Sequence, residues 1–464
     1  MKKTGRLITI LLVAAMMVSV LSGCGGKNEV DDGKVKITIG SWPDDTNPNG
    51  QKVHEEVLAQ MNEKYPNVII EKDNTKYSDA KLFQAKAAAD KLPTLWPAWF
   101  TEVNNYITNG YAADITDILK KKGMLEDLNP QLLEMVTSKD GGIYAFPTDA
   151  YAQGLTVNKV LFEQAGLVNE DGTVKEPSTY EELAEFAKII KEKTGKPGFA
   201  ICTAGNQGGW QFMNIAWSYG VEFMKQREDG SWEATFNTQE MIDALQYVKD
   251  LKWKYDVLPT ESVLKKADIM KYLAIDEVGM IIQGPSGDYA SKYGMDPENL
   301  SIVRLPAGPN GRVVQMGGNL YAFSSTASDE QLSASIDWLK QFGYENTVTE
   351  EQLQNIENGI KETLDNRGIV FPETVFPLWV NGDLQDKKDE LLKKYTNVSA
   401  NDYEKYYSFE DCKLRPEEPV ACQQLYSILD GCIQEVLTNK DADVKALVEV
   451  AAKDFQNNHL DKLD

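Results

Sequence analysis

Histidine is almost absent from this 464-residue chain, which restricts the chemistry that the protein can carry out. His54 and His459 supply its only imidazole rings. A Ser-His-Asp or Cys-His apparatus needs an imidazole as its base, so we expect no catalytic group of that kind. The sequence also lacks an HExxH segment, an EF-hand loop and a phosphate-cradling glycine motif. The short signatures of zinc proteases, calcium-binding loops and P-loop nucleotide hydrolases are therefore missing.

Cysteine is scarce as well, and its spacing argues against a metal site. The chain has five cysteines, and those beyond the N-terminal segment are Cys202, Cys412, Cys422 and Cys432. They form no CxxC pair, so we predict neither a zinc site nor any other metal or cofactor. An exported chain could form a disulfide, which the spacing does not assign. Buried free thiols are the favoured interpretation, and a disulfide stays open as the alternative.

Positive charge is in deficit, and long apolar runs are missing from most of the chain. The sequence has 48 Lys and Arg against 71 Asp and Glu, which gives a formal net charge of −23. Such a surface repels nucleic acid, so we expect no nucleic-acid partner. Beyond Lys34 no apolar run reaches the roughly 20 residues that a membrane-spanning helix needs. The length suggests two or three domains or lobes.

The N-terminus is the exception to this polar character. It begins with a positively charged stretch that contains Lys2, Lys3 and Arg6. An apolar run at residues 7–20 follows, of signal-peptide length and too short for a comfortable transmembrane helix. The run ends in "LSGC", residues 21–24, which resembles the lipobox of bacterial lipoproteins.

This resemblance implies that residues 1–23 are a signal peptide, cleaved before Cys24, and that the Cys24 sulfur is lipidated, for example with palmitate. Residues 24–34 are rich in glycine and charge and predict a flexible tether. An ordinary secretory signal with a chance cysteine is the alternative. Because one acyl chain anchors only marginally, stable attachment needs at least two.

The following segments alternate between strand and helix patterns. "VKITIG", residues 35–40, alternates β-branched residues with others and predicts a strand, and "VIIEKDN", residues 68–74, predicts a second one. Residues 51–65 have helical spacing, and residues 78–92 form a helix capped by Ser78 or Asp79. Such alternation favours an α/β fold with a mainly parallel sheet. "PTLWPAWF", residues 93–100, is expected to be a proline-bounded loop.

Helix-capping and turn signals also occur further along the chain. Thr179 and Glu182 form a capping box at the start of a helix that Gly195 should end. Asp229-Gly230 predicts a hairpin turn. "EVGMIIQGPS", residues 277–286, is typical of a buried strand that leads into a Gly-Pro loop.

Six short stretches then occur in an order and spacing that match one family. They are "AFP" (145–147), "VNKVLFEQAGL" (157–167), "PSTYEEL" (177–183), "VGMIIQGPS" (278–286), "LPAGPNG" (305–311) and "GGNLYAF" (317–323). Each is weak alone, but the ordered set resembles the extracellular solute-binding proteins of ABC importers, in the branch that includes maltodextrin-binding protein. The resemblance covers nearly the whole chain after the N-terminal segment.

The resemblance implies a periplasmic-binding-protein type II fold. Two α/β lobes, each a mainly parallel sheet flanked by helices, are joined by a hinge and trap a solute between them. The chain is expected to cross between lobes near Pro147, Gly318 and Pro416. The first lobe would hold residues 35–148 and about 320–410, and the second about 149–318 and 411–464.

The residues suggest a ligand site in loops at strand ends. Trp42 follows the first strand, with Asp44 and Asp45 beside it. A flat ring offers apolar area to a sugar face, and carboxylates accept hydrogen bonds from hydroxyl groups. In the proline-bounded loop one tryptophan should anchor the loop in the core, and Trp99 is favoured over Trp96 as the ligand-facing one.

Further candidates lie at the crossings and in the second lobe. Asp149 and Tyr151 follow the first crossing and could bridge the lobes, and Asn319 follows the paired glycines of another. The remaining candidates are Asn206 and Trp210 in "AGNQGGW" and Gln283 and Ser286 in "QGPS". Ser286 stands where many relatives carry a stacking tryptophan, which argues against a long malto-type ligand. The alternative to ligand contact is structural packing, of Trp42 under its loop and of Trp210 in the core.

The favoured function is reversible capture of a solute, most simply a mono- or oligosaccharide, for an ABC permease. The protein would be a non-enzymatic monomer anchored through Cys24 to the outer face of the cell membrane. A ligand that bridges two lobes favours their closed state in proportion to its differential affinity for that state. The alternatives are a surface glycoside hydrolase, which needs only two carboxylates, a non-sugar binding protein, and an adhesin or scaffold.

Overall fold

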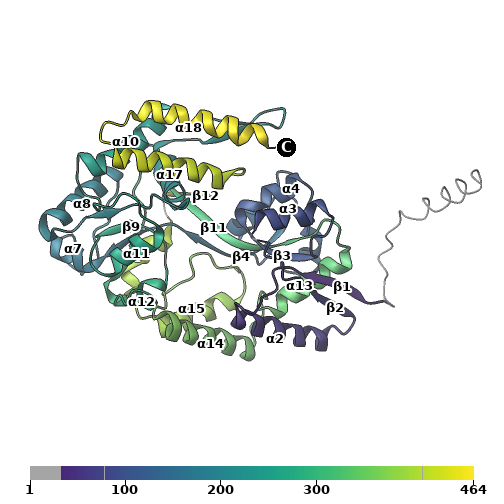
Figure 1. Ribbon diagram of the computed structural model, residues 1–464. Helices are drawn as coiled ribbons and strands as arrows, with labels where there is room; N and C mark the ends of the chain where they lie inside the picture. Colours follow the sequence, from purple (N-terminus) through teal and green to yellow (C-terminus); the bar gives the residue numbers. More distant parts are fainter. Residues whose placement is uncertain (1–32, 78, 410, 464) are drawn as a thin grey trace, which may run out of the picture.

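The computed structural model describes residues 33–77, 79–409 and 411–463, which fold into two α/β lobes connected by long strands (Figure 1). The predicted signal peptide, Cys24 and nearly all of the tether lie outside the described residues. Within the described part of the chain, no helix is both long and apolar enough to cross a bilayer. The two-lobed α/β fold confirms the expected fold class.

The larger sheet forms the core of the first lobe and reaches into the second. Its six strands are β1 (Val35–Ile39), β2 (Val68–Lys72), β3 (Leu95–Trp99), β4 (Ala145–Ala152), β11 (Arg312–Phe323) and β12 (Cys412–Arg415). β1 pairs in parallel with β2 and β3, whereas β11 pairs antiparallel with β3 and β4 and in parallel with β12. The alternation read from the first strand is confirmed, since Ile37 and Ile39 are buried.

Helices flank this sheet in the first lobe (Figure 1). They are α2 (Pro48–Lys64), α3 (Ala80–Ala88), α4 (Val103–Thr108), α5 (Thr116–Lys121), α6 (Pro130–Glu134) and α13 (Asp329–Gln341). Capping residues set their starts: Asn47 accepts a hydrogen bond from the Gly50 N–H, and Asp79 from the amides of the first turn of α3. The predicted Asp79 cap is confirmed.

The segment expected to be a proline-bounded loop is instead strand β3. Leu95 pairs with Ile39 of β1, and the rest of the strand runs alongside β11. Trp96 is fully buried in this position, whereas Trp99 is 48% exposed. The two prolines misled the prediction, because only Leu95 pairs with β1, so β3 has a neighbouring strand on one side alone at Pro97, and an open side tolerates proline. The burial of Trp96 agrees with the expectation that one of the two tryptophans is anchored in the core, and ligand contact by Trp99 stays a prediction.

The second lobe contains a smaller sheet that is not mainly parallel. Its order is β10 (Leu300–Val303), β5 (Leu155–Asn158), β9 (Met280–Ile282) and β6 (Phe199–Ala200). β5 pairs antiparallel with both β9 and β10, and only β6 and β9 are parallel. The expectation of a mainly parallel sheet is therefore wrong here. β5 follows β4 after two residues rather than after a helical crossover, so it enters this sheet in the opposite direction to β9.

Helices cover the smaller sheet and extend over the top of the second lobe in Figure 1. They are α7 (Lys159–Ala165), α8 (Tyr180–Thr194), α9 (Gln207–Tyr219), α10 (Gln239–Trp253), α11 (Lys266–Ala274), α12 (Asp288–Ser291), α17 (Cys422–Thr438) and α18 (Val444–Asn458). Thr179 caps α8 by accepting from the Glu182 N–H, and Gly195 ends it in a left-handed conformation. The hairpin β7 (Met224–Gln226) to β8 (Trp232–Ala234) turns at Asp229-Gly230, as expected.

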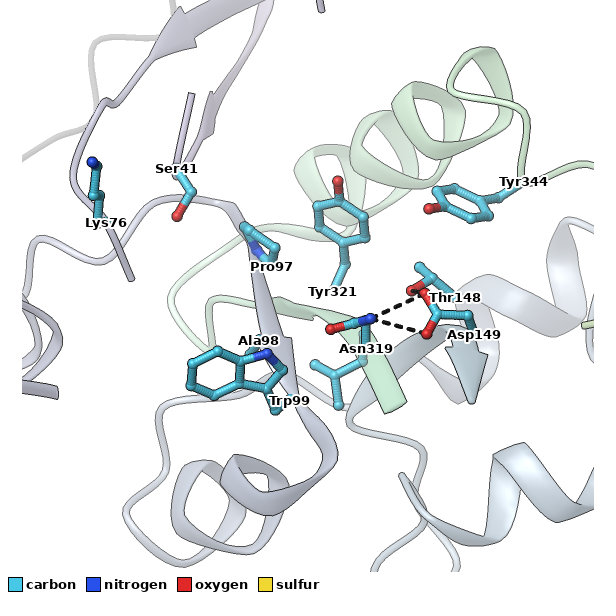
Figure 2. A pocket seen from close by; sticks show the side chains of 11 residues that line it. Ser41, Lys76, Pro97, Ala98, Trp99, Thr148, Asp149, Asn319, Tyr321 and Tyr344 are labelled. Carbon is cyan, nitrogen blue, oxygen red and sulfur yellow. Dashed lines mark hydrogen bonds between the residues drawn. The ribbon is translucent and has the colours of Figure 1, made fainter. Parts of the chain in front are cut away.

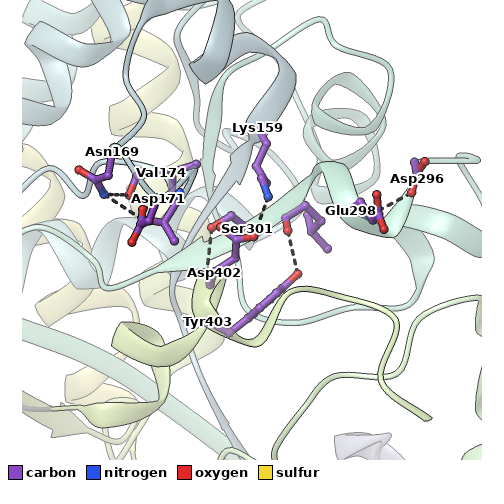
Figure 3. Close-up of polar contacts among 11 residues, drawn as sticks. Lys159, Asn169, Asp171, Val174, Asp296, Glu298, Ser301, Asp402 and Tyr403 are labelled. Carbon is purple, nitrogen blue, oxygen red and sulfur yellow. Dashed lines mark hydrogen bonds and ion pairs between the residues drawn. The ribbon is translucent and has the colours of Figure 1, made fainter. Parts of the chain in front are cut away.

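A helical segment after α13 connects the two lobes a further time. It comprises α14 (Glu350–Arg367), α15 (Asp383–Tyr395), η3 (Ala400–Asp402) and α16 (Glu404–Ser408). Between α14 and α15 the chain meets the first lobe, where the Asn129 N–H donates to the Leu378 carbonyl at 2.9 Å. Further on it meets the second lobe: Lys159 pairs with Asp402 at 2.7 Å, and the Tyr403 hydroxyl donates to the Leu300 carbonyl (Figure 3).

These contacts differ from the expected assignment of residues 320–410 to the first lobe. Ile369, Val398, Tyr403 and Tyr406 share a hydrophobic core with residues of the smaller sheet and its helices. The physical reason is burial of apolar surface, since Tyr403 and Tyr406 are at most 1% exposed and belong to the hydrophobic cluster of that lobe. The exact division of the chain into lobes otherwise stays a prediction.

The described cysteines are free. Cys202, Cys422 and Cys432 are buried thiols, and Cys412 is half-buried on β12. This confirms the interpretation as free thiols rather than a disulfide. Burial raises the pKa of the Cys422 thiol to about 12, so this side chain is an unreactive thiol at neutral pH.

We expect Gly209→Ala in α9 to lower the free energy of unfolding by about 1–3 kcal/mol, the usual cost of overpacking. A Cβ at Gly209 would lie 2.4 Å from the Tyr426 carbonyl oxygen of α17 and would force the two helices apart. Urea denaturation followed by circular dichroism measures the effect.

Gly431→Ala in α17 is the matched control, because a Cβ there meets nothing within 4 Å. Helix propensity should make this variant about 0.5–1 kcal/mol more stable than the parent. Equal stability of the two variants would contradict the close approach of α9 and α17.

Candidate functional site

Two cavities lie where the strands of the larger sheet cross between the lobes. The first has a volume of about 370 Å³ and is lined by Ser41, Lys76, Pro97, Ala98, Trp99, Thr148, Asp149, Asn319, Leu320, Tyr321 and Tyr344 (Figure 2). The second, of about 250 Å³, is lined by Trp99, Thr101, Tyr151, Gly205, Asn206, Gln207, Trp210, Gly318, Glu417, Gln423 and Tyr426. Trp99 belongs to both walls, so the two cavities adjoin at this residue, and together they are called the cleft.

Strand pairing brings the polar groups of the first cavity together. In β11, Asn319 is paired with Trp99 of β3 on one side and with Asp149 of β4 on the other. The Asn319 amide donates to both carboxylate oxygens of Asp149, at 2.9 and 3.1 Å (Figure 2). Three residues that are far apart in sequence thus meet at one register position. All three were expected to contact the ligand, and the structure places them in one wall.

Two tyrosines that the sequence reasoning missed complete this wall. Tyr321 is half-buried on β11 and Tyr344 follows α13, and their rings lie 6.3 Å apart. Burial, followed by the charge of Asp149, raises the pKa of Tyr344 to about 12, so its hydroxyl stays protonated and can donate. Tyr321 could have been found, because it lies two residues after Asn319 and so shares its strand face. Tyr344 has no comparable signal.

The other missed side chains of the first cavity are Ser41, Lys76 and Thr148. Lys76 supplies a positive charge, and its Nζ lies 3.7 Å from Asp44. A hydrogen bond from Thr46 is the main reason why the pKa of Asp44 is below its usual range. Asp44 is therefore an ion-pair partner of a residue that lines the cavity. Asp44 and Asp45 do not line either cavity, in contrast to the expectation.

Tyr151 and Trp210 face each other in the second cavity. Their ring centroids are 6.5 Å apart, and Tyr151 is 40% exposed. Local burial, with added repulsion from Glu417 and Asp149, raises the pKa of Tyr151 to about 12. Asn206 stands at the start of α9 with a φ of 66°. The structure thus places these three predicted residues, together with Trp99, in the wall of the second cavity.

Gly317 explains how the Tyr151 ring can lie close to the backbone of β11. A Cβ at this position would come within 2.6 Å of the Tyr151 hydroxyl oxygen. The paired glycines of "GGNLYAF" therefore serve the shape of the cleft as well as the crossing itself. Thr101, Glu417, Gln423 and Tyr426 of this cavity were missed by the sequence reasoning, which had placed only a crossing near Pro416.

The structure corrects the placement of Trp42. This ring is 4% exposed and packs against His54 and Trp338, with centroids 5.0 and 5.7 Å away. Its face is therefore covered by protein and is not available to a solute. The strand-end position was correctly read, but the ring turns toward α2 and α13 because aromatic neighbours bury it there.

Gln283 and Ser286 also lie outside both cavities. Gln283 is 6% exposed, and its N–H donates to the Gly154 carbonyl at 2.9 Å. The Ser286 hydroxyl accepts a hydrogen bond from the Asp288 N–H and so holds the start of α12. The loop after β9 is thus used to build the lobe rather than to line the cleft.

The chain is similar to known binding proteins. It is 24% identical over 336 residues to a putative binding protein of Brucella abortus (strain 2308), which covers 70% of this chain and 76% of that protein. It is 20% identical over 345 residues to the melibiose/raffinose/stachyose-binding protein MelE of Bacillus subtilis (strain 168), at 71% and 76% coverage.

The fold has a solved counterpart in the cyclic α-maltosyl-1,6-maltose binding protein of Arthrobacter globiformis. The TM-score is 0.63 at 23% identity, with 91% of this chain and 98% of that chain covered. The sequence model of the family described as bacterial extracellular solute-binding protein matches residues 44–342, which is more than half of the chain. Together with the two-lobed fold and the cleft at its crossing strands, this match shows that the chain belongs to the bacterial extracellular solute-binding protein family.

Proposed function

We propose that this protein captures a mono- or oligosaccharide outside the cell and delivers it to the permease of an ABC importer. The observation that carries the proposal is the exposed ring of Trp99 in the middle of the cleft, bordered by hydrogen-bonding side chains of both cavities. A sugar ring has an apolar face that stacks on an indole and a rim of hydroxyls that need donors and acceptors.

The polar groups around Trp99 match that requirement. Asp149 keeps acceptor capacity beyond its two bonds from Asn319, because an ionised carboxylate accepts at about four positions. Tyr321 and Tyr344 supply phenolic hydroxyls to the same cavity. A few oriented polar groups beside apolar surface are the usual composition of a small-molecule site between lobes.

The crossing strands supply the means of closure. β4 and β11 run from one lobe to the other, and the cleft walls carry residues from both sides of the crossing. A solute that contacts Trp99 and Trp210 together gains binding energy only when the lobes are near each other. It therefore shifts the open–closed equilibrium toward the closed state, which is the form that a permease would recognise.

The comparisons support a carbohydrate. The relative MelE is named for binding melibiose, raffinose and stachyose, and the structural counterpart for binding a cyclic maltosyl-maltose. These names describe what those two proteins bind. Because the identities are low, the solute of this chain has to be inferred from its own cleft. A non-sugar solute remains the first alternative, and a surface glycoside hydrolase the second.

Anchoring through Cys24 completes the proposal. A lipid on this sulfur would hold a monomer at the outer face of the cell membrane, within reach of its permease, with residues 24–34 as the tether. Family membership supports the extracellular location. The "LSGC" motif is what supports the lipid.

Cys24→Ala should release the protein from the membrane fraction of expressing cells, because the acceptor of the acyl chains is removed. Immunoblots of membrane and soluble fractions, compared with Cys412→Ala as a control, measure this. A Cys24→Ala protein that stays in the membrane fraction would contradict lipidation at this residue.

A thermal-shift screen of the mature protein, with Cys24 replaced by alanine, tests capture itself. The panel is glucose, galactose, maltose, maltotriose, melibiose, raffinose, stachyose and xylotriose. A captured sugar should raise the melting temperature further with each tenfold increase of its concentration above Kd, since stabilisation grows with the logarithm of concentration and reaches about 2.7 kcal/mol at 100 times Kd. No shift with any sugar would contradict carbohydrate capture, and sustained release of sugar products would contradict a purely binding role.

Trp99→Ala should weaken binding of the best sugar of that panel at least tenfold, because the stacking surface at the middle of the cleft is lost. Titration calorimetry measures the affinity. Trp253→Ala is the matched control, since that ring is similarly exposed, at 38% against 48%, but lines neither cavity. Equal affinities of the two variants would refute the assignment of Trp99.

A further inference from the structure

Two consecutive glutamates on the third crossing have contrasting surroundings. Glu418 is 3% exposed, pairs with Arg415 at 3.1 Å and accepts a hydrogen bond from the Trp217 indole, also at 3.1 Å. Its charge is thus met by a cation and a donor within the second lobe. This glutamate anchors the crossing segment.

Glu417 points into the cleft instead. It lines the second cavity and also an adjoining space of about 500 Å³ between α6 and β12. The Tyr426 hydroxyl donates to its Oε1 at 2.7 Å. Among the described residues, no lysine or arginine forms an ion pair with it. Burial raises the pKa of the Glu417 carboxyl, and hydrogen bonds from Tyr426 and Trp210 oppose this rise.

The position of this carboxylate is held by its neighbours. Pro416 and Pro419 flank Glu417 and Glu418, and each proline ring fixes its own φ angle. Tyr426, on the first turns of α17, donates to its Oε1. An ionised carboxylate accepts at about four positions, so Glu417 keeps acceptor capacity for a solute beyond the bonds from Tyr426 and Trp210. A half-buried carboxylate without a cation is costly unless donors satisfy it, so a solute that brings hydroxyl groups relieves that cost.

We propose that Glu417 is a specificity-determining residue, whose carboxylate accepts hydrogen bonds from solute hydroxyls and, with Asp149, restricts the cleft to solutes without negative charge. This rests on the proposed function. The two carboxylates line different cavities that share Trp99: Asp149 lines the first and Glu417 the second. An anionic group beside either one meets a like charge at short range, and water screens this repulsion less at Glu417, which is half-buried, than at the exposed Asp149.

The cations at the cleft are outnumbered or engaged. Lys76 lines the first cavity, but Asp149 in the same wall and Asp44, 3.7 Å from the Lys76 Nζ, are two carboxylates for this one ammonium. The Lys266 ammonium lies 5.9 Å from the Trp210 ring centroid. The net charge of −23 adds a long-range field that also disfavours approach of an anion. Local and long-range electrostatics therefore act in the same direction, and selection by repulsion is an ordinary route to specificity.

The test compares one sugar with its anionic counterpart. The probes are the panel sugar that gives the largest thermal shift and the same sugar oxidised at a C6 hydroxyl to a carboxylate, both titrated by calorimetry at low ionic strength. The parent protein should bind the neutral sugar at least tenfold more tightly. Glu417→Gln should bind the neutral sugar about tenfold more weakly and reduce the preference over the anionic form several-fold.

Glu134→Gln is the matched control, because it removes the same charge from the adjoining space and leaves the cleft wall intact. It should keep both the affinity and the preference. Glu417→Asp, which keeps the charge on a shorter side chain, should retain the preference while losing neutral-sugar affinity. It also separates a charge effect from a folding defect in Glu417→Gln.

Unchanged affinities in Glu417→Gln, with sugar binding intact in the parent protein, would overturn this inference alone. Equal binding of neutral and anionic forms by the parent protein would overturn it as well. Failure of the parent protein to bind any sugar of the panel would overturn the proposed function and this inference together.

Discussion

The antiparallel pairing of β4 with β11 is the constraint on which the structure depends. It runs from Ala152 opposite Met316 to Ala145 opposite Ala322, with a register shift next to Asn319, and it carries the chain between the lobes twice. Backbone hydrogen bonds hold this register, so the register fixes which side chains of the two strands lie next to each other. The cleft is built on that ladder: Asn319 has Asp149 on one side and Trp99 on the other.

Small residues make this arrangement possible. Gly317 lets the Tyr151 ring lie close, and a Cβ at Gly318 would come within 2.3 Å of the Asp149 carbonyl oxygen. Around the ladder, the segment of α14 and α15 connects the lobes at their far edge, and the third crossing carries Glu417 and Glu418 in opposite directions. The same backbone thus supplies the hinge, the stacking ring and the charges that face a solute.

Local patterns predicted much of the fold and part of the cleft. The caps at Asp79 and Thr179, the hairpin at Asp229-Gly230 and the buried strand β9 depend on neighbours in sequence, and all were read correctly. Trp42 and Gln283 were misplaced for a different reason. Each follows a strand end, as ligand-contacting residues do, but its burial is decided by elements elsewhere in the chain, such as α13 over Trp42.

The sequence by itself determined the chemical class of the molecule. Its net charge and its low histidine content are sums over the sequence, and its ordered motifs are short-range patterns. None of these properties depends on how the chain folds. Only the tertiary structure decided which side chains share the cleft. Tyr344, Glu417 and Tyr426 come from segments that meet Trp99 through pairings more than 200 residues apart. Because such contacts arise from strand register and helix packing rather than from local periodicity, no pattern within one segment could have revealed them.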